Sequence, residues 1–320
     1  MNSPLCRPAR CLGVATLVLL LARDACAQTP RDTMVLVATP KGALSFVAMG
    51  DWGMNGERHQ REVAQQMGRV AETLGAQFVL VLGDNFYPNG VQSTRDPQWK
   101  TSFEDIYTSL SLGIDWYVAL GNHDYRGRPE AQLEYSNVSR RWRLPARYYK
   151  VSKAVAPGVT ADFLIIDTSP FMSEYRKEPD KYAVAGTDTA AQRRWIAQTL
   201  ATSKAKWKFI VGHHNVYSGG KRTVEPDMER LLVPIMKRYG VAAYICGHEH
   251  HLEHIAPEGS GLQFLISGGG AEGHPAEGTK GTRFVSSEAG FLALALSADS
   301  LLVQAVDYHG TLLYRAAIKR

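Results

Sequence analysis

The chain has 320 residues, of which 45% are hydrophobic and 21% are charged, and its formal charge is +5. The length suffices for one large α/β domain or two small ones, and the composition is that of an ordinary folded protein. The positive charge is mild and is not gathered into a basic stripe, which argues against a nucleic-acid-binding protein.

The first 27 residues have the pattern of a cleaved secretory signal. Arg7 and Arg10 precede an apolar run over residues 11–22, and Ala25-Cys26-Ala27 offers a small-residue cleavage site. The apolar run is shorter than the ~20 residues that a membrane span needs. We therefore expect a secreted or periplasmic protein without a membrane anchor, in which residues 28–41 form a polar leader.

Loss of this segment changes both the charge and the cysteine content. Removing three arginines and one aspartate from the 36 basic and 31 acidic residues leaves a formal charge of +3. Cys246 is then the only cysteine, so an internal disulfide is excluded. Stability outside the cytoplasm must come from core packing.

Short continuous apolar runs predict strands that are buried on both faces. They lie at Leu44–Met49, Phe78–Leu82, Trp116–Leu120, Phe163–Ile166, Phe209–Val211 and Ala242–Ile245. Three helices are predicted between them. The first ends before Gly75, the second begins with a capping box formed by Thr189 and Gln192, and the third runs from Pro226 to Gly240.

The pattern changes after residue 250, where strands follow one another with short turns. These strands are predicted at Leu262–Ile266, Phe291–Leu296, Leu301–Val306 and Leu312–Ile318. No linker or repeat divides residues 42–320, which predicts a single α/β domain. Alternating strands and helices followed by strands alone predict two stacked sheets with helices on the outside.

Five of the predicted strands are followed by a glycine and then by a side chain that ligates metals. These side chains are Asp51, Asp84, Asn122, His213 and His248. A lone aspartate or asparagine after glycine is usually only a turn former. Ligands in open α/β sheets gather beyond the carboxyl ends of strands, so five such exits predict one shared site.

Two further candidate ligands follow the same exits, Tyr87 and His250. With the other five they satisfy the needs of a two-metal site, including a carboxylate that bridges the ions. An isolated tyrosine is better explained as a packing residue whose hydroxyl reaches solvent. Within this set, the phenolate of Tyr87 favours a hard, highly charged ion such as Fe(III), and we expect it within a few ångströms of the histidines of the last motif.

The motifs Gly-Asp-Trp-Gly (50–53), Gly-Asp-Asn-Phe-Tyr (83–87), Gly-Asn-His-Asp (121–124), Gly-His-His-x-x-Tyr-Ser (212–218) and Gly-His-Glu-His (247–250) occur in this order. They resemble those of the purple acid phosphatases, most closely the small tartrate-resistant type of the calcineurin-like metallophosphoesterase superfamily. The resemblance extends from about Leu44 to the C-terminus.

This resemblance implies a four-layer αββα metallophosphoesterase sandwich of two mainly mixed β-sheets. It also implies a secreted acid phosphatase that hydrolyses phosphate monoesters by in-line attack of metal-bound hydroxide. The ferric site would comprise Asp51, Tyr87 and His250, and the divalent site, for Fe, Zn or Mn, would comprise Asn122, His213 and His248. Asp84 would bridge the two ions.

The resemblance further implies that His123 contacts phosphate and acts in catalysis, with Asp124 orienting it. A second histidine that the family often carries near the substrate is missing, because Lys221 and Arg222 stand in this stretch. The candidate substrate-binding residues are therefore Asn122, His123, His214, Lys221 and Arg222. The loop over residues 171–186 is a candidate for an exposed, mobile lid.

Two other functions stay open on the residues alone. One is a metallophosphodiesterase of the same superfamily, against which Tyr87 argues, and the other is a catalytically inactive phosphate-binding relative, against which the intact ligand set argues. The expected partners are small phosphorylated substrates, with phosphoproteins as a further class, and neither nucleic acid nor membrane. We expect a monomer.

Overall fold

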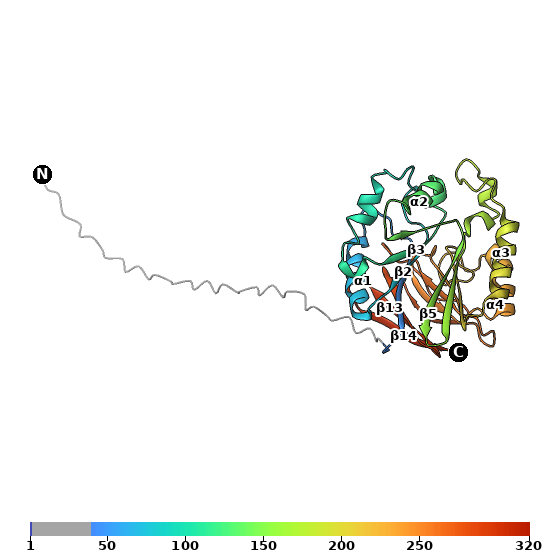
Figure 1. Cartoon of the computed structure of the whole chain (residues 1–320). Helices are drawn as coiled ribbons and strands as arrows, with labels where there is room; N and C mark the ends of the chain where they lie inside the picture. The colour runs from blue at the N-terminus through green and yellow to red at the C-terminus, as the bar shows by residue number, and fades with distance from the viewer. Residues whose placement is uncertain (2–39) are drawn as a thin grey trace. The chain divides into compact units, whose positions relative to one another are not determined.

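The computed structural model describes Met1 and residues 40–320 (Figure 1). The predicted signal and nearly all of the predicted leader lie outside the described residues, and the domain boundaries at residues 27 and 41 stay predictions. From residue 40 onward the described chain belongs to one compact unit. None of the helices in this part of the chain combines the length and the apolar character needed to cross a bilayer.

Two seven-stranded sheets form the centre of this unit. The first has the order β14-β13-β12-β1-β2-β3-β4. Its strands are β1 (Leu44–Met49), β2 (Phe78–Leu82), β3 (Asp115–Ala119), β4 (Trp142–Arg143), β12 (Gly290–Leu296), β13 (Ser300–Asp307) and β14 (Leu312–Lys319). Strands β1, β2 and β3 pair in parallel, whereas β12, β13 and β14 pair antiparallel, so the sheet is mixed.

The second sheet has the order β11-β9-β10-β8-β7-β6-β5. Its strands are β5 (Tyr149–Ala156), β6 (Val159–Ile165), β7 (Trp207–Val211), β8 (Ala243–Cys246), β9 (Leu252–Ile255), β10 (Phe264–Ser267) and β11 (Thr282–Ser286). Here β6, β7, β8 and β10 are parallel neighbours. In both sheets, therefore, the carboxyl ends of the central strands lie at one edge, as the sequence predicted.

Helices cover the outer faces of the two sheets. They are α1 (Gln60–Leu74), α2 (Pro129–Tyr135), α3 (Thr189–Thr202) and α4 (Pro226–Tyr239), joined by the short helical turns η1 (Trp99–Glu104), η2 (Leu110–Leu112), η3 (Asp124–Arg126), η4 (Ser169–Phe171) and η5 (Tyr175–Lys177). Figure 1 shows α1 on one side of the strands and α3 and α4 on the opposite side. This arrangement confirms the predicted αββα sandwich.

Residues at the helix ends determine where each helix starts or stops. Helices α1 and α4 stop at Gly75 and Gly240, both of which adopt the left-handed conformation that glycine tolerates best. At α3 the cap differs from the prediction, because Asp188 and not Thr189 is the N-cap and accepts the backbone N–H of Ala191. An ionised carboxylate next to the helix N-terminus is a strong capping group, and Thr189 becomes the first helical residue.

Aromatic side chains hold the two sheets together. Phe46 and Phe78 stack within the first sheet at 4.7 Å between ring centroids, and Phe163 and Phe209 stack within the second at 4.9 Å. Phe46 meets Phe163 edge to face at 5.4 Å across the sheet interface. Rings of this kind contribute about 0.5–1.5 kcal/mol per pair beyond the area they bury, and they fix the two sheets as a rigid base for the loops above.

Candidate metal centre

Loops from both sheets converge where their parallel strands end. The five predicted ligands at the strand exits are all buried, and their exposed fractions do not exceed 7%. The two sheets meet directly there, because the backbone N–H of His248, after β8, donates to Oδ2 of Asp51, after β1, at 2.8 Å. The fold therefore places side chains that are 197 positions apart in the sequence side by side.

Tyr87 points into this cluster. Its hydroxyl lies 3.0 Å from Oδ1 of Asp51, 2.9 Å from Oδ2 of Asp84 and 3.1 Å from Nε2 of His250. One hydroxyl proton cannot satisfy three such neighbours. Burial and both carboxylates raise the pKa of Tyr87 well above its usual value, so the phenol keeps its proton unless a cation is bound nearby. The orientation agrees with the expectation from the sequence.

Asp84 lies between the two predicted groups of ligands. Its Oδ2 is 2.9 Å from the hydroxyl of Tyr87 on one side and 3.4 Å from Nε2 of His213 on the other. Its Oδ1 accepts the backbone N–H of His123 at 2.7 Å, which fixes the carboxylate in place. A carboxylate with this position has the geometry that a bridge between two ions requires.

The second group surrounds Nε2 of His213. Nδ1 of this ring donates to the carbonyl oxygen of Leu82 at 2.8 Å, so Nδ1 carries a proton and Nε2 is the nitrogen left to bind a metal ion when its own proton is lost. That nitrogen lies 3.1 Å from Oδ1 of Asn122 and 3.1 Å from Nδ1 of His248. Several electron-rich atoms thus converge on one point, as around a metal ion.

The charge balance of the cluster also fits a cation. Burial disfavours the charged form of His213, but the neighbouring carboxylate of Asp84 outweighs it and raises the pKa of His213 to about 9. Without a metal ion, the cluster therefore binds a proton on His213, and this proton supplies the positive charge that the carboxylates favour. Nε2 of His248 and Nδ1 of His250 are buried without any hydrogen-bond partner among the described residues. The donor set therefore fits the binuclear centre that the sequence predicts.

Backbone strain gathers at the same place. Asp51, Asp84 and His248 have φ values of 61°, 50° and 72°, a region that residues with a side chain rarely adopt. Each such residue costs on the order of 1–3 kcal/mol, which the surrounding structure must offset. Three of the predicted ligands are thus held in conformations that the fold, and not local preference, imposes.

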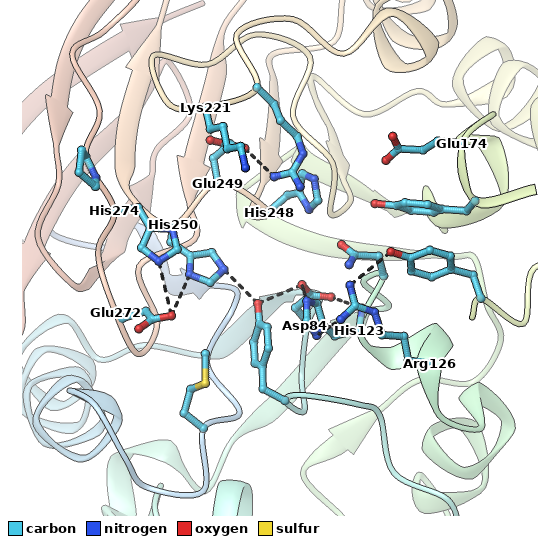
Figure 2. A pocket seen from close by; sticks show the side chains of 17 residues that line it. Asp84, His123, Arg126, Glu174, Lys221, His248, Glu249, His250, Glu272 and His274 are labelled. Carbon is cyan, nitrogen blue, oxygen red and sulfur yellow. Dashed lines mark hydrogen bonds and ion pairs between the residues drawn. The ribbon is translucent and has the colours of Figure 1, made fainter. Parts of the chain in front are cut away.

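A cavity of about 580 Å³ opens above the cluster (Figure 2). Its lining combines predicted ligands with cationic and aromatic side chains. The lining residues that the prediction included are Asp84, Tyr87, Asn122, His123, Lys221, Arg222, His248 and His250. The site thus has room for a substrate beside the predicted metal ligands.

His123 presents one nitrogen to this cavity. Its Nδ1 lies 2.7 Å from the carbonyl oxygen of Pro88, so Nδ1 carries a proton. Its Nε2 then faces the cluster, 4.0 Å from Oδ2 of Asp84. Burial lowers the pKa of His123. The ring is therefore held in one tautomer with Nε2 free to contact a substrate oxygen.

Asp124 differs from the expectation. Its carboxylate does not reach the ring of His123. It accepts the backbone N–H groups of Gly121 and Asn85 and the side-chain amide of Gln132. The buried Asp124 therefore ties the loops after β2 and β3 together, and the carbonyl of Pro88 orients the imidazole instead.

Of the predicted substrate-binding residues, the two long cationic side chains line the cavity and one histidine does not. Lys221 and Arg222 both line the cavity, and Nη1 of Arg222 donates to Oε1 of Glu249 at 3.0 Å. His214 is not among the lining residues. It is fully buried, and its two ring nitrogens lie 2.8 Å from the hydroxyls of Thr168 and Tyr175. The structure therefore places His214 behind the cavity wall.

Most residues of the loop over residues 171–186 are exposed, as the sequence suggested, but a few buried side chains anchor the loop to the domain. Tyr175 and Tyr182 are buried and stack at 4.1 Å between ring centroids. The backbone N–H of Ala183 donates to the carbonyl oxygen of Tyr125. Both tyrosines line the cavity, so the loop contributes a wall of the site.

Sequence reasoning missed Arg126 and Glu272, which line the cavity. Nη2 of Arg126 donates to the hydroxyl of Tyr182 at 3.2 Å, and its Nε is buried without a partner among the described residues. Arg126 directly follows the Gly-Asn-His-Asp motif and Tyr125, and this proximity was the one signal available. Glu272 comes from the glycine-rich loop after β10, and nothing in its local sequence indicates where that loop folds.

Comparison with known proteins supports one family. A family model described as calcineurin-like phosphoesterase matches residues 44–252. Purple acid phosphatase 7 of Arabidopsis thaliana is 36% identical over 87% of this chain and 87% of its own length. Tartrate-resistant acid phosphatase type 5 of Homo sapiens is 33% identical over 88% of this chain and 92% of its own length.

Solved structures agree at the level of the fold. The GAP50 anchor in the inner membrane complex of Plasmodium has a TM-score of 0.76 at 25% identity, covering 87% of this chain and 89% of that one. Purple acid phosphatase PPD1 from yellow lupin (Lupinus luteus) has a TM-score of 0.63 at 18% identity, covering 88% and 54%. The motifs, the fold and these relatives together show that the chain belongs to the purple acid phosphatase family of calcineurin-like phosphoesterases.

Proposed function

We propose that this protein is a metal-dependent acid phosphatase that hydrolyses phosphate monoesters at a binuclear Fe(III)–M(II) centre. The observation that carries the proposal is the position of the Tyr87 hydroxyl, within 3.1 Å of Asp51, Asp84 and His250. A tyrosine among carboxylates and imidazoles selects a hard, highly charged ion. The named activity of the relatives, acid phosphatase, agrees with this assignment.

The proposed ferric ligands are Asp51, Tyr87 and His250. The proposed ligands of the second ion are Asn122, His213 and His248, and this divalent ion would be Fe, Zn or Mn. Asp84 is the proposed bridge. When bound, such a pair of ions acidifies water, so that a nucleophile is available at low pH, and neutralises charge on the phosphoryl group. The protein contributes fixed, buried donors, which lowers the reorganisation that binding requires.

The side chains around the cavity divide the remaining work. His123 turns Nε2 toward the cavity, because its Nδ1 donates to the carbonyl of Pro88, and the protonated ring would donate from Nε2 to a phosphate or leaving-group oxygen. Arg126 and Arg222 stand in the cavity lining, and each keeps guanidinium donors beyond the bonds described above. A guanidinium binds phosphate through two parallel N–H groups, so these residues are suited to hold the substrate.

Comparison of a monoester with a diester tests the reaction class. We expect para-nitrophenyl phosphate to be hydrolysed with a higher kcat/KM than bis-para-nitrophenyl phosphate at acidic pH. Elemental analysis of the same preparation should show two metal ions per chain. A clear preference for the diester would favour a metallophosphodiesterase. Two bound ions and phosphate binding without turnover would favour an inactive binding protein, and the same fold occurs in the Plasmodium protein described as an anchor in the inner membrane complex.

Replacing Tyr87 by phenylalanine tests the ferric ion. The wild-type holoprotein is expected to absorb visible light through a tyrosinate-to-iron band, and Tyr87→Phe is expected to lose that band, because the phenolate oxygen is gone. The absorption spectrum and the iron content are the measurements. Tyr117→Phe is a matched control, since this half-buried tyrosine lies on β3 away from the cavity. A colourless, iron-free wild-type enzyme with full activity would contradict the assignment.

The remaining proposals rest on the sequence. A cleaved signal over residues 1–27 would deliver the protein to the periplasm or the cell exterior. The proposed partners are small phosphorylated substrates, with phosphoproteins as a second class. We propose no nucleic-acid or membrane partner, and a monomer.

A further inference from the structure

Glu272 lies at the edge of the cavity between two imidazole rings. Its Oε1 is 3.5 Å from Nδ1 of His250 and 3.5 Å from Nε2 of His274. Figure 2 shows the carboxylate with contacts to both rings. Its other oxygen, Oε2, lies 3.4 Å from Nε of Arg58. One oxygen of the carboxylate is thus held by the two histidines and the other by Arg58.

The two nitrogens of His250 have different surroundings. Nε2 faces the metal cluster, 3.1 Å from the hydroxyl of Tyr87 and 3.6 Å from Oδ1 of Asp51. Nδ1 is buried on the opposite side of the ring and has no hydrogen-bond partner in the part of the chain that the structure describes. A neutral ring that gives the lone pair of Nε2 to a metal must carry its proton on Nδ1. A buried N–H without an acceptor is costly, and Oε1 of Glu272, at 3.5 Å, is in position to become that acceptor.

We propose that Glu272 is a positioning residue that accepts the Nδ1 proton of His250 and so presents Nε2 to the ferric ion. Metal-ligating histidines commonly donate their other nitrogen to a carboxylate, which fixes both tautomer and ring orientation. This inference rests on the proposed binuclear centre and deepens it, because it names a residue outside the ligand set on which the centre depends.

The neighbouring histidine supports the same geometry. The ring of His274 stacks on that of His250 at 4.4 Å between centroids and 22° between planes. The backbone N–H of His274 donates to the carbonyl oxygen of His250 at 2.5 Å. The loop that carries Glu272 is therefore tied to His250 by its backbone as well, which keeps the carboxylate beside Nδ1 of the ring.

A third metal ion is the competing explanation. The ligand atoms of His250, Glu272 and His274 lie within 4.8 Å of one another, close enough to hold a cation. His250 would then have to ligate through Nδ1 while its Nε2 serves the binuclear centre. That requires loss of both ring protons, which a neutral imidazole resists. The positioning role needs only the ordinary neutral ring.

The test uses holoprotein of the wild type and of Glu272→Ala, Glu272→Gln and Glu277→Gln. Glu277 is an exposed glutamate in the same loop and is the matched control. Three quantities are measured: metal ions per chain, the rate of metal loss to a chelator, and the visible absorption band. We expect Glu272→Ala to lose iron about 10–100-fold faster than wild type, with a shifted band, and Glu272→Gln to lie between them, since its amide oxygen still accepts the proton.

The outcomes separate the alternatives. Unchanged metal loss and an unchanged band in Glu272→Ala would overturn the positioning role while the proposed function stands. A third ion in the wild type that disappears in Glu272→Ala would overturn it in favour of a third metal site. A wild-type chain without metal would overturn this inference together with the proposed function. Thermal unfolding of the metal-free variants, expected to match the wild type, shows that the fold is retained.

Discussion

Replacing Asp84 by asparagine is expected to abolish binding of both metal ions and to lower phosphatase activity by about 10³-fold or more. Asp84 stands between the two groups of predicted ligands, with its Oδ2 2.9 Å from the hydroxyl of Tyr87 and 3.4 Å from Nε2 of His213. An amide carries no charge and bridges two cations poorly. The loss of several kcal/mol of charge stabilisation in the transition state corresponds to about three orders of magnitude in rate.

This variant is expected to be less stable than the wild type when both are free of metal. Asp51 is fully buried beside Asp84, and its pKa is raised well above the usual value by burial and by the Asp84 charge, with His213 opposing this effect. Relief of this repulsion is outweighed, because burial opposes ionisation of Asp84 but the neighbouring His213 still holds the pKa of Asp84 well below its usual value. Asp84→Asn leaves the buried His213 without this carboxylate, and a cooperative unfolding transition above the assay temperature would show that loss of metal reflects the missing bridge and not an unfolded protein.

Elemental analysis, kcat with para-nitrophenyl phosphate and thermal unfolding of the metal-free protein are the measurements. Asp115→Asn is the matched control, because Asp115 lies at the amino end of β3, remote from the strand exits, where it pairs with Arg143. The control should keep wild-type metal content and activity. Normal content of both ions in Asp84→Asn would show that the bridge is another residue.

The strand exits could be predicted because two independent signals coincide there. Val79 and Leu80 belong to one of the continuous apolar runs that indicate strands buried on both faces, and a glycine and a ligand follow five of these runs. The order of the motifs then identified the family. Side chains that come directly after a parallel strand can therefore be placed from the sequence, because parallel pairing brings all such strand ends to one edge of the sheet.

Other elements lacked such a signal. Strand β5 lies at the edge of its sheet and alternates between buried and exposed residues, and β11 is only half-buried, so neither carries a continuous apolar run. The same limit applies to the cavity wall. Glu272 meets His250 only because the loop after β10 folds back over the last histidine motif. Contacts between loops depend on the tertiary structure, and no local pattern in the chain encodes them.

Replacing a glycine at a strand exit is expected to have a second large effect on metal binding, although this glycine ligates no metal. Gly121→Ala is expected to reduce metal affinity at least ~10-fold although every ligand is retained. A Cβ at residue 121 would lie 2.2 Å from the backbone nitrogen of Asp84 and 2.3 Å from its Oδ1. Both atoms belong to a buried loop, so the carboxylate or the loop after β2 must shift away from the position that the bridge requires.

The cost in stability should accompany the loss of metal. Forcing a methyl group into a closed site typically costs about 1–3 kcal/mol, and here the obstructing atoms are backbone and a constrained carboxylate. Thermal unfolding of the metal-free protein measures this cost, and elemental analysis after dialysis measures the metal. Gly113→Ala is the matched control on the other end of β3. Its φ is −72°, and the nearest atom to an added Cβ is the carbonyl oxygen of Leu110 at 3.1 Å, near the exposed surface.

The contrast between these two glycines separates packing at the site from a general effect of losing glycine. If the metal centre depends on the close approach of the loops after β2 and β3, Gly121→Ala loses iron and the divalent ion while Gly113→Ala keeps both. Equal metal content in the two variants would mean that Asp84 tolerates displacement. The bridge would then not depend on the position in which the N–H of His123 holds its carboxylate.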